Sequence, residues 1–178
     1  MFLEKLFYPF SGRNIIIGRH IKSQLEFLEK IVPEDFKRKK IHDLGCGDGR
    51  ITFLLQRIFR AEHCSGYDFN EKLIKLARKR GIEAKVLDIE KKVPGGEMAV
   101  IWGVLHHLKS PKKFLKMIKD NYQLVFLREP LKRGLTILEL GKPFQREEIK
   151  KYLDESFGTY RSYIYDNAIF AFWEKRNN

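Results

Sequence analysis

Apolar positions along the chain switch repeatedly between helical and strand-like spacing. Ile21, Leu25, Leu28 and Val32 recur at the intervals of one helix face within 19–32, and Pro33 predicts the end of that helix. The same reasoning predicts further helices at 48–60, between 70 and 81, at 111–119 and at 145–156. Short apolar or alternating runs predict strands at 40–44, 64–68, 84–87, 97–104, 122–127, 160–165 and 168–174. This alternation predicts a single α/β domain with a mainly parallel sheet.

Local signals support several of these boundaries. Asn70 is expected to cap one helix, and Ser110 another that has proline at its first position. The pair Asp166-Asn167 predicts a tight turn between the last two strands. The connection from Asp88 to Glu97 is too short for a crossover helix. We therefore expect an extended crossing there and one stretch of sheet without a covering helix.

The first predicted strand ends at Asp43 and enters a loop with glycine at every second position, Gly45, Gly47 and Gly49. Glycine allows positive φ and close approach of the backbone to a ligand, and the following helix adds free amide donors. The dinucleotide fingerprint G-x-G-x-x-G would need glycine where Arg50 stands. A ligand without phosphates, such as one with an amino-acid moiety, suits this loop better.

The pattern of an acidic residue followed by G-x-G-x-G resembles the first motif of the class I S-adenosylmethionine (SAM) methyltransferases. The resemblance extends over about Lys40 to Trp173. It implies a Rossmann-like α/β fold with seven strands in the order 3-2-1-4-5-7-6, the last strand antiparallel. It also implies SAM as cofactor and S-adenosylhomocysteine (SAH) as product. The short connection after the third strand departs from the family pattern.

Further motifs carry the family's cofactor contacts onto this chain. Asp68, about 20 residues after the glycine loop, can accept hydrogen bonds from a ribose diol, and Phe69 is placed to lie against adenine. Asp88 and Ile89 match the adenine-binding pair after the third strand. The resemblance thus implies these cofactor residues: Asp43, Gly45, Cys46, Gly47, Gly49, Asp68, Phe69, Asp88, Ile89, Trp102 and Gly103.

The fourth strand ends in Leu-His-His-Leu, which resembles the family's small-molecule and general subgroup. His106 and His107 are the candidates for a general base, although methyl transfer is an in-line displacement that needs chiefly alignment. The amine-methylating Asp/Asn-Pro-Pro-aromatic signature, a cysteine nucleophile and the aspartate of ribose 2′-O enzymes are absent from this position. These absences argue against three common nucleic-acid subtypes.

Acceptor contacts are expected from the loop after the fifth strand and from the N-terminal segment. The candidates are Arg19, His20 and Arg128. We divide the chain into an N-terminal arm and helix, 1–39, expected to form a lid over cofactor and substrate, and a methyltransferase domain, 40–178.

The formal net charge of +12 raises the question of RNA as acceptor. Two basic stripes, one along 72–80 and one along 109–119, are expected on opposite faces of the sheet, whereas a nucleic-acid footprint gathers on one surface. A small-molecule acceptor is therefore preferred, with RNA as the alternative. Outside methyl transfer, the alternatives are a nicotinamide-dependent oxidoreductase and a SAM-binding module without catalysis.

Two cysteines, Cys46 and Cys64, form neither a disulfide framework nor a metal pattern, so no metal is expected. The N-terminal residues lack a signal-peptide run, and no apolar stretch approaches the ~18 residues of a membrane span. We expect a cytoplasmic protein that does not enter a membrane, either monomer or homodimer.

Overall fold

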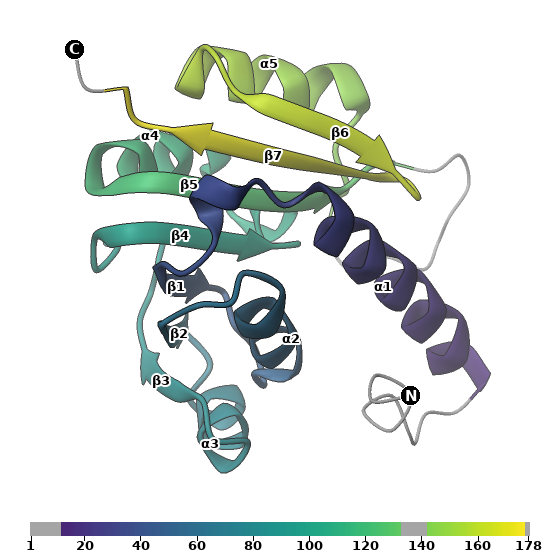
Figure 1. Ribbon diagram of the computed structural model, residues 1–178, viewed down its shortest axis with the longest axis vertical. Helices are drawn as coiled ribbons and strands as arrows, with labels where there is room; N and C mark the ends of the chain where they lie inside the picture. The colour runs from purple at the N-terminus through teal and green to yellow at the C-terminus, as the bar shows by residue number, and fades with distance from the viewer. Residues whose placement is uncertain (1–11, 133–141, 177–178) are drawn as a thin grey trace.

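The structure is a computed structural model that describes residues 12–132 and 142–176, with side chains from residue 18 onward. Its described residues form one seven-stranded sheet in the order β3-β2-β1-β4-β5-β7-β6 (Figure 1). The first five strands are parallel, and β7 is antiparallel to both of its neighbours. The strands are β1 (Lys40–Leu44), β2 (His63–Asp68), β3 (Glu83–Val86), β4 (Gly96–Trp102), β5 (Tyr122–Pro130), β6 (Arg161–Tyr165) and β7 (Ala168–Glu174). The predicted fold and strand order are confirmed.

Five α-helices and two short 3-10 turns connect the strands within the described residues. They are α1 (Gly12–Ile31), η2 (Glu34–Phe36), α2 (Arg50–Ile58), α3 (Glu71–Lys79), η3 (Leu105–His107), α4 (Pro111–Asn121) and α5 (Arg146–Phe157). The Asn70 cap of α3 is confirmed, because its Oδ1 accepts from the backbone amides of Lys72 and Leu73. Ser110 stands at the N-cap position of α4, but its side chain makes no capping hydrogen bond.

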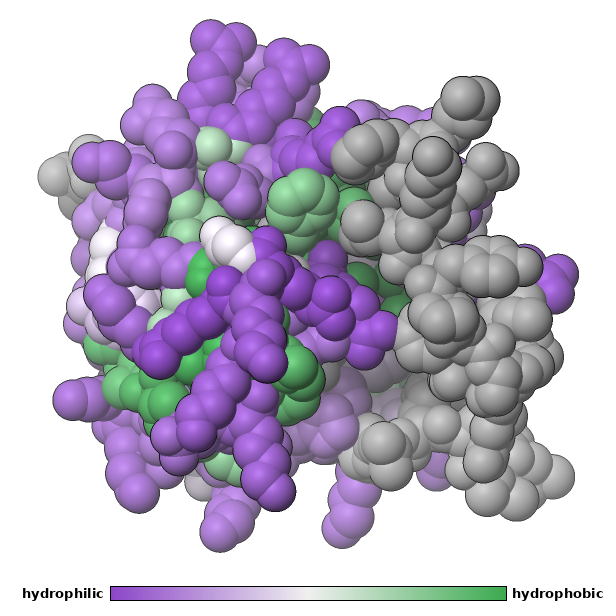
Figure 2. Space-filling view, turned by 90° about the horizontal axis from the view of Figure 1, so that it is seen from below, coloured by the Kyte–Doolittle hydropathy of each residue, from purple (hydrophilic) through white to green (hydrophobic). Residues whose placement is uncertain are grey.

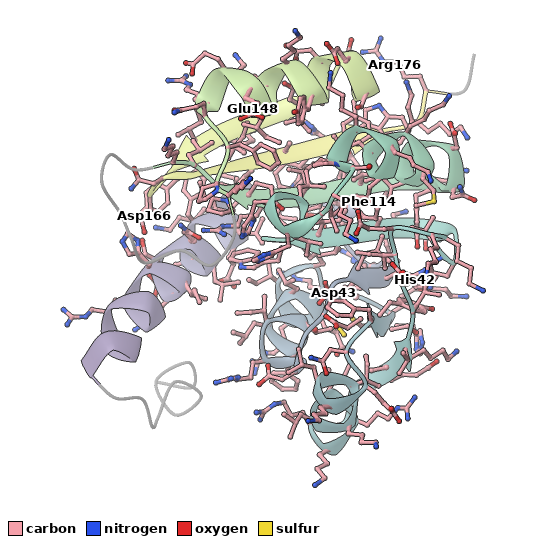
Figure 3. All side chains as sticks on the ribbon, turned by 180° about the vertical axis from the view of Figure 1, so that it is seen from behind. His42, Asp43, Phe114, Glu148, Asp166 and Arg176 are labelled. Carbon is pink, nitrogen blue, oxygen red and sulfur yellow. The ribbon has the colours of Figure 1, made fainter. Side chains whose placement is uncertain are left out.

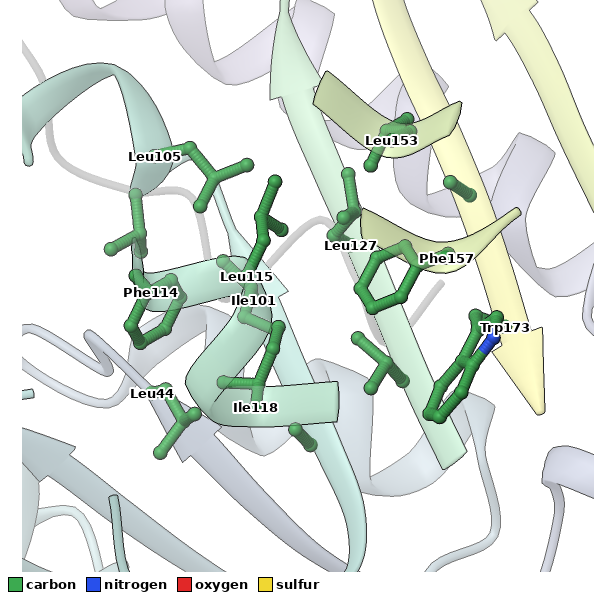
Figure 4. Packing of buried hydrophobic residues seen from close by; sticks show 14 of the residues in the cluster. Leu44, Ile101, Leu105, Phe114, Leu115, Ile118, Leu127, Leu153, Phe157 and Trp173 are labelled. Carbon is green, nitrogen blue, oxygen red and sulfur yellow. The ribbon is translucent and has the colours of Figure 1, made fainter. Parts of the chain in front are cut away.

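The central strands are buried on both faces, which explains their nearly continuous apolar sequences. One face packs on α1 and α2 through a cluster that includes Leu28, Leu55 and Phe126. The other face packs on α4 and α5. Figure 4 shows this second cluster, with Phe114 and Ile118 of α4 facing Ile101 of β4, and Phe157 of α5 beside Trp173 of β7.

The crossing from β3 to β4 has no helix, as the short connection predicts. Residues 87–95 form turns and extended chain. The adjacent sheet face is correspondingly polar, because the register places His42, Ser65 and Glu83 side by side on β1, β2 and β3. His42 Nδ1 lies 3.1 Å from the Tyr122 hydroxyl. The half of the sheet that lacks a covering helix thus carries polar side chains, which need no apolar partner.

Helix α1 is docked onto the hairpin of β6 and β7. The turn residues Asp166 and Asn167 have φ of 47° and 54°, as a tight hairpin turn requires. The Asp166 carboxylate hydrogen-bonds His20, and its backbone oxygen accepts from Gln24 Nε2 at 2.8 Å; Figure 3 shows Asp166 beside α1. Phe27 stacks on Tyr165 with ring centroids 4.3 Å apart. The helix therefore shares the core of the domain; the predicted lid role of 1–39 stays a prediction, and residues 1–11 lie outside the described residues.

Candidate functional site

A cavity of about 650 Å³ opens where the carboxyl ends of β1 to β4 meet. Open α/β sheets bind ligands at this edge. Of the sequence-predicted residues, it brings together Gly45, Asp68, Phe69, Asp88, Ile89, Gly103 and His107. The remaining lining residues are Asn70, Leu73, Glu90, Val104, Leu108 and Lys109. The residues Asp43, Cys46, Gly47, Gly49, Trp102 and His106 are not part of the lining.

The loop between β1 and α2 owes its shape to its three glycines. Gly45, Gly47 and Gly49 have φ of +88°, +54° and +80°, where other residues are strained. A Cβ on Gly45 would lie 2.5 Å from Val104 Cγ2, so the loop touches the end of β4. A Cβ on Gly47 would meet nothing within 4 Å. The loop thus packs tightly at its first glycine and leaves open space at its second.

Asp68 links this loop to the start of α3. Its Oδ2 accepts from the Gly47 amide at 3.0 Å, and its Oδ1 accepts from the Asn70 amide at 2.8 Å. Only 8% of the residue is exposed, yet it lines the cavity. Each carboxylate oxygen has a second lone pair, so Asp68 can accept further hydrogen bonds from a hydroxyl-bearing ligand.

Phe69 and Asp88 form the outer rim of the cavity. Phe69 is 76% exposed, which is unusual for a large aromatic ring and leaves one of its faces open to a planar ligand. The Asp88 carboxylate pairs with Lys91 at 3.0 Å, and this hydrogen bond lowers the pKa of Asp88. Ile89 is buried beside them.

Asp43 lies inside the molecule rather than on the cavity wall (Figure 3). Its Oδ2 accepts from the Thr52 hydroxyl at 2.6 Å. Burial raises the pKa of the Asp43 carboxyl to about 7, the Thr52 hydrogen bond opposes this, and the charge of Asp68 adds to it. The acidic residue at the end of β1 therefore braces the base of α2.

The two cysteines are free, buried thiols. Burial raises the pKa of both thiols well above the usual range. A Cβ on Gly66 of β2 would lie 2.8 Å from Cys46 Sγ, so this side chain packs between the glycine loop and the sheet. Neither thiol has the properties of a nucleophile.

The ends of β4 and β5 carry a second group of polar side chains, centred on Glu129. Its Oε1 accepts from the backbone amides of Val104 and Leu105 at 2.7 and 2.8 Å, and its Oε2 lies 2.8 Å from His106 Nδ1. Glu129 is fully buried. The sequence alone did not single it out, because its partners lie 23 to 25 residues away along the chain. The one signal in the sequence was an acidic residue two positions after the end of the predicted strand 122–127.

The two neighbouring histidines are placed differently. His107 lines the cavity, and burial, followed by the nearby charge of His106, lowers its pKa. His106 lies behind it, with ring centroids 3.9 Å apart.

The predicted acceptor residues are also separated in space. The Arg128 guanidinium lies over the Trp102 ring, 5.3 Å from its centroid. A Cβ on Gly103 would lie 3.4 Å from Arg128 Nη1, so Arg128 adjoins the cavity wall. His20 contacts Asp166 of the hairpin instead, and Arg19 is exposed on the same helix.

The described residues show neither a metal-binding cluster nor a membrane-spanning helix. They contain no group of three or more His, Cys, Asp or Glu side chains that could hold a metal ion. No helix among them is long and apolar enough to cross a membrane.

A family model described as a methyltransferase domain matches residues 18–174. The chain belongs to this methyltransferase family. The predicted family is thereby confirmed, and this family uses SAM as its cofactor. The match begins within α1, consistent with the packing of that helix on the sheet.

Solved structures support the fold of this methyltransferase. Magnesium protoporphyrin IX methyltransferase from Synechocystis PCC 6803, crystallised with bound SAH, aligns with a TM-score of 0.74 at 12% identity, over 97% of this chain and 92% of that one. A possible histamine N-methyltransferase from Thermotoga maritima aligns with a TM-score of 0.69 at 13% identity, over 89% of each chain.

A curated human relative, named probable tRNA methyltransferase 9B, is 30% identical over 83 residues. This stretch is 45% of the present methyltransferase chain and 17% of the human protein. The chain therefore spans about a sixth of the length of the curated relatives that it matches.

Proposed function

We propose that the protein transfers the methyl group of SAM to a nucleophilic atom of a small-molecule acceptor. The observation that carries this proposal is one cavity that joins Gly45, the first glycine of the loop, a buried carboxylate at Asp68 and an exposed ring at Phe69. These features fit the amino-acid end, the ribose and the adenine of SAM, respectively. The bound cofactor supplies a methyl group on a sulfonium, which is displaced in line.

The cofactor would be held mainly by backbone groups and few side chains. The loop of Gly45, Gly47 and Gly49 would bind the methionine part of SAM. Cys46 would support this loop by packing against β2. Asp68 would bind the ribose hydroxyls, and Ile89 and Phe69 would enclose the base. Asp88 would accept a hydrogen bond from the exocyclic amine of adenine while it also pairs with Lys91. Asp43 would act indirectly, by bracing the loop.

The acceptor would approach from the side of β4 and β5. Gly103 lines the cavity and adjoins both Arg128 and His106, so these two side chains lie next to the cavity wall there. Trp102 supports the Arg128 guanidinium. We retain His106 and His107 as candidates for the general base, and Arg128 with Arg19 and His20 as candidates for acceptor contacts.

Small-molecule acceptors are favoured by the names of two neighbours, which refer to a porphyrin and to histamine. RNA remains the second candidate, because the curated relatives are named for tRNA and the chain carries a net charge of +12. However, α3 and α4 pack on opposite faces of the sheet, so their basic stripes cannot form one footprint. Figure 2, seen from the end of the molecule where α3 lies, shows hydrophilic side chains over much of that end.

The family match also bears on the two functions outside methyl transfer. A nicotinamide-dependent oxidoreductase is inconsistent with that match. A measurement of methyl transfer distinguishes an enzyme from a SAM-binding module without catalysis, because only the enzyme turns over. A cytoplasmic location, and a monomer or homodimer, remain part of the proposal; light scattering coupled to gel filtration tests the latter.

The deciding experiment has two stages. Calorimetric titration with SAH should give one saturable site per chain, and titration with NAD should give no heat. Methyl-labelled SAM is then incubated with a panel of small hydroxyl, amine, thiol and carboxylate compounds and, separately, with tRNA. Label in a small compound supports the proposal, and label only in tRNA or absence of SAH binding contradicts it.

A further inference from the structure

One ring nitrogen of His106 faces a carboxylate. Nδ1 lies 2.8 Å from Oε2 of the fully buried Glu129, and the His106 side chain is itself only 7% exposed. A carboxylate accepts hydrogen bonds but cannot donate them, so Nδ1 must carry the proton. The neutral ring then keeps its lone pair on Nε2. Among the described residues, none hydrogen-bonds Nε2, which is therefore available to take a proton.

The Glu129 carboxylate is itself held in place by hydrogen bonds to the backbone. Its other oxygen accepts from the amides of Val104 and Leu105, in the turn that also carries Gly103 and His106. One carboxylate thus fixes both the course of the turn and the orientation of the ring. Groups that act on a substrate need such support from a locked neighbour.

The His106 ring lies directly behind the part of the cavity wall formed by Gly103, which has no side chain. A Cβ on Gly103, which lines the cavity, would be 3.7 Å from His106 Cε1. Besides Glu129, the charged or titratable groups that the described residues place near the ring include His107, whose ring is tilted by 41° against it, and Arg128, whose Nη1 would lie 3.4 Å from the same Cβ position at Gly103. His107 is nearer the cavity, but no carboxylate among the described residues sets its tautomer.

Resting on the proposed function, we propose that His106 is the general base of the reaction and that Glu129 is its positioning residue. The Nε2 lone pair takes the proton of an acceptor O–H, N–H or S–H group. The acceptor atom forms a bond to the methyl carbon while the bond between that carbon and the sulfonium sulfur breaks. The electron pair of the broken bond stays on sulfur. The imidazolium is stabilised by Glu129 and later returns its proton to water.

Nuclear magnetic resonance of the ¹⁵N-labelled protein tests the tautomer without any turnover. The His106 signals are assigned by their loss in His106→Asn. In the wild type with saturating SAH, we expect a proton on Nδ1 and none on Nε2. In Glu129→Gln, the new amide oxygen is needed by the Val104 and Leu105 amides, so its nitrogen must donate to Nδ1. The ring proton should then move to Nε2.

Kinetics supply the second readout, using the acceptor with the highest turnover in the panel above. Glu129→Gln and His106→Asn should each lower kcat by about 100-fold or more, the usual contribution of a general base, while the Kd for SAH changes less than about threefold. The wild type should lose kcat at low pH, and His106→Asn should lack this limb. His107→Asn, the matched comparison, should keep it and alter chiefly KM or the Kd for SAH.

Three results would overturn the inference: a proton on Nε2 in the wild type, a Glu129→Gln variant with wild-type kcat, or loss of the low-pH limb in His107→Asn but not in His106→Asn. These results are separable from failure of the proposed function. If SAH binds but nothing in the panel is methylated, the small-molecule proposal fails, and the tautomer measurement still decides for or against the role of Glu129.

Discussion

The two halves of the sheet's carboxyl edge are built in different ways. Beside β1 and β2, the site consists of glycine backbone in left-handed conformations and a carboxylate, Asp68, bound to nearby amides. Beside β4 and β5, it consists of a buried side-chain network in which Glu129 reaches back to His106 and the turn before it. We call these the cofactor half and the acceptor half.

Because of this difference, we expect different kinds of substitution to disrupt the two halves. Backbone conformation in the cofactor half is sensitive to any added Cβ, whereas the acceptor half depends on which atoms donate and accept hydrogen bonds. Their buried carboxylates illustrate this. Glu129 receives three hydrogen bonds within the described residues, while Asp43 receives one, from Thr52. A buried charge with little compensation is costly.

The largest expected effect follows from Asp43. Its pKa rises from 3.8 to about 7 on folding, so between these values the folded protein binds more protons than the unfolded chain. Stability should therefore fall as pH rises through this window and then level off. Relative to Asp43→Asn, which lacks this titration, the wild type should lose up to about 4 kcal/mol of unfolding free energy between pH 4 and 7. Urea denaturation of both proteins across this range checks the prediction; parallel pH curves would contradict it.

The next effect concerns Asp68, which joins the two segments of the cofactor half. Asp68→Ala removes a carboxylate that holds the Gly47 and Asn70 amides, and should weaken SAH binding by about 100-fold or more, since each charge-assisted hydrogen bond contributes about 1.5–3 kcal/mol. Asp68→Asn keeps one strong acceptor and should lose about 10-fold. Calorimetry measures both, with thermal melting as the control for folding. Equal affinity in the alanine variant and wild type would remove Asp68 from the cofactor site.

The contrast between the halves also explains what the sequence could predict. The strand β1, its glycine loop and the Asn70 cap are local patterns, decided by residues a few positions apart, and each is confirmed. The helix missing between β3 and β4 followed from chain length alone. By contrast, Ser110 was expected to cap α4 through its side chain and does not, since its backbone, at φ −133° and ψ 69°, lies outside the extended region usual for an N-cap residue.

Long-range contacts account for the rest. Helix α1 begins at Gly12, before the predicted start at Arg19, and β5 continues to Pro130, beyond the predicted end at Leu127. The extra strand length is held by antiparallel pairing with β7, which single-segment patterns do not reveal. The same extension places Glu129 beside His106, so only the fold distinguishes His106 from His107.

A pair of glycines isolates packing from backbone strain. Gly49 and Gly81 have φ of +80° and +83°, but a Cβ on Gly49 would lie 3.1 Å from the Ala77 backbone, whereas one on Gly81 would meet nothing within 4 Å. Gly81→Ala should cost about 1 kcal/mol of unfolding free energy through strain alone, and Gly49→Ala about 2–3 kcal/mol because α3 must shift. Equal losses in denaturant titrations would show that the loop does not depend on its close approach to α3.

The smallest effect distinguishes binding from stability within the cofactor half. Phe69 is 76% exposed and lines the cavity, so Phe69→Ala removes little buried area and should change the unfolding free energy by less than about 0.5 kcal/mol. Loss of a stacked aromatic ring should nevertheless weaken SAH binding by about 5- to 10-fold, equivalent to roughly 1 kcal/mol. Leu76→Ala is the matched control, because Leu76 is 43% exposed on α3 and does not line the cavity. An equal decrease in SAH affinity for both variants, measured by calorimetry, would mean that Phe69 acts through α3 and does not contact the adenine.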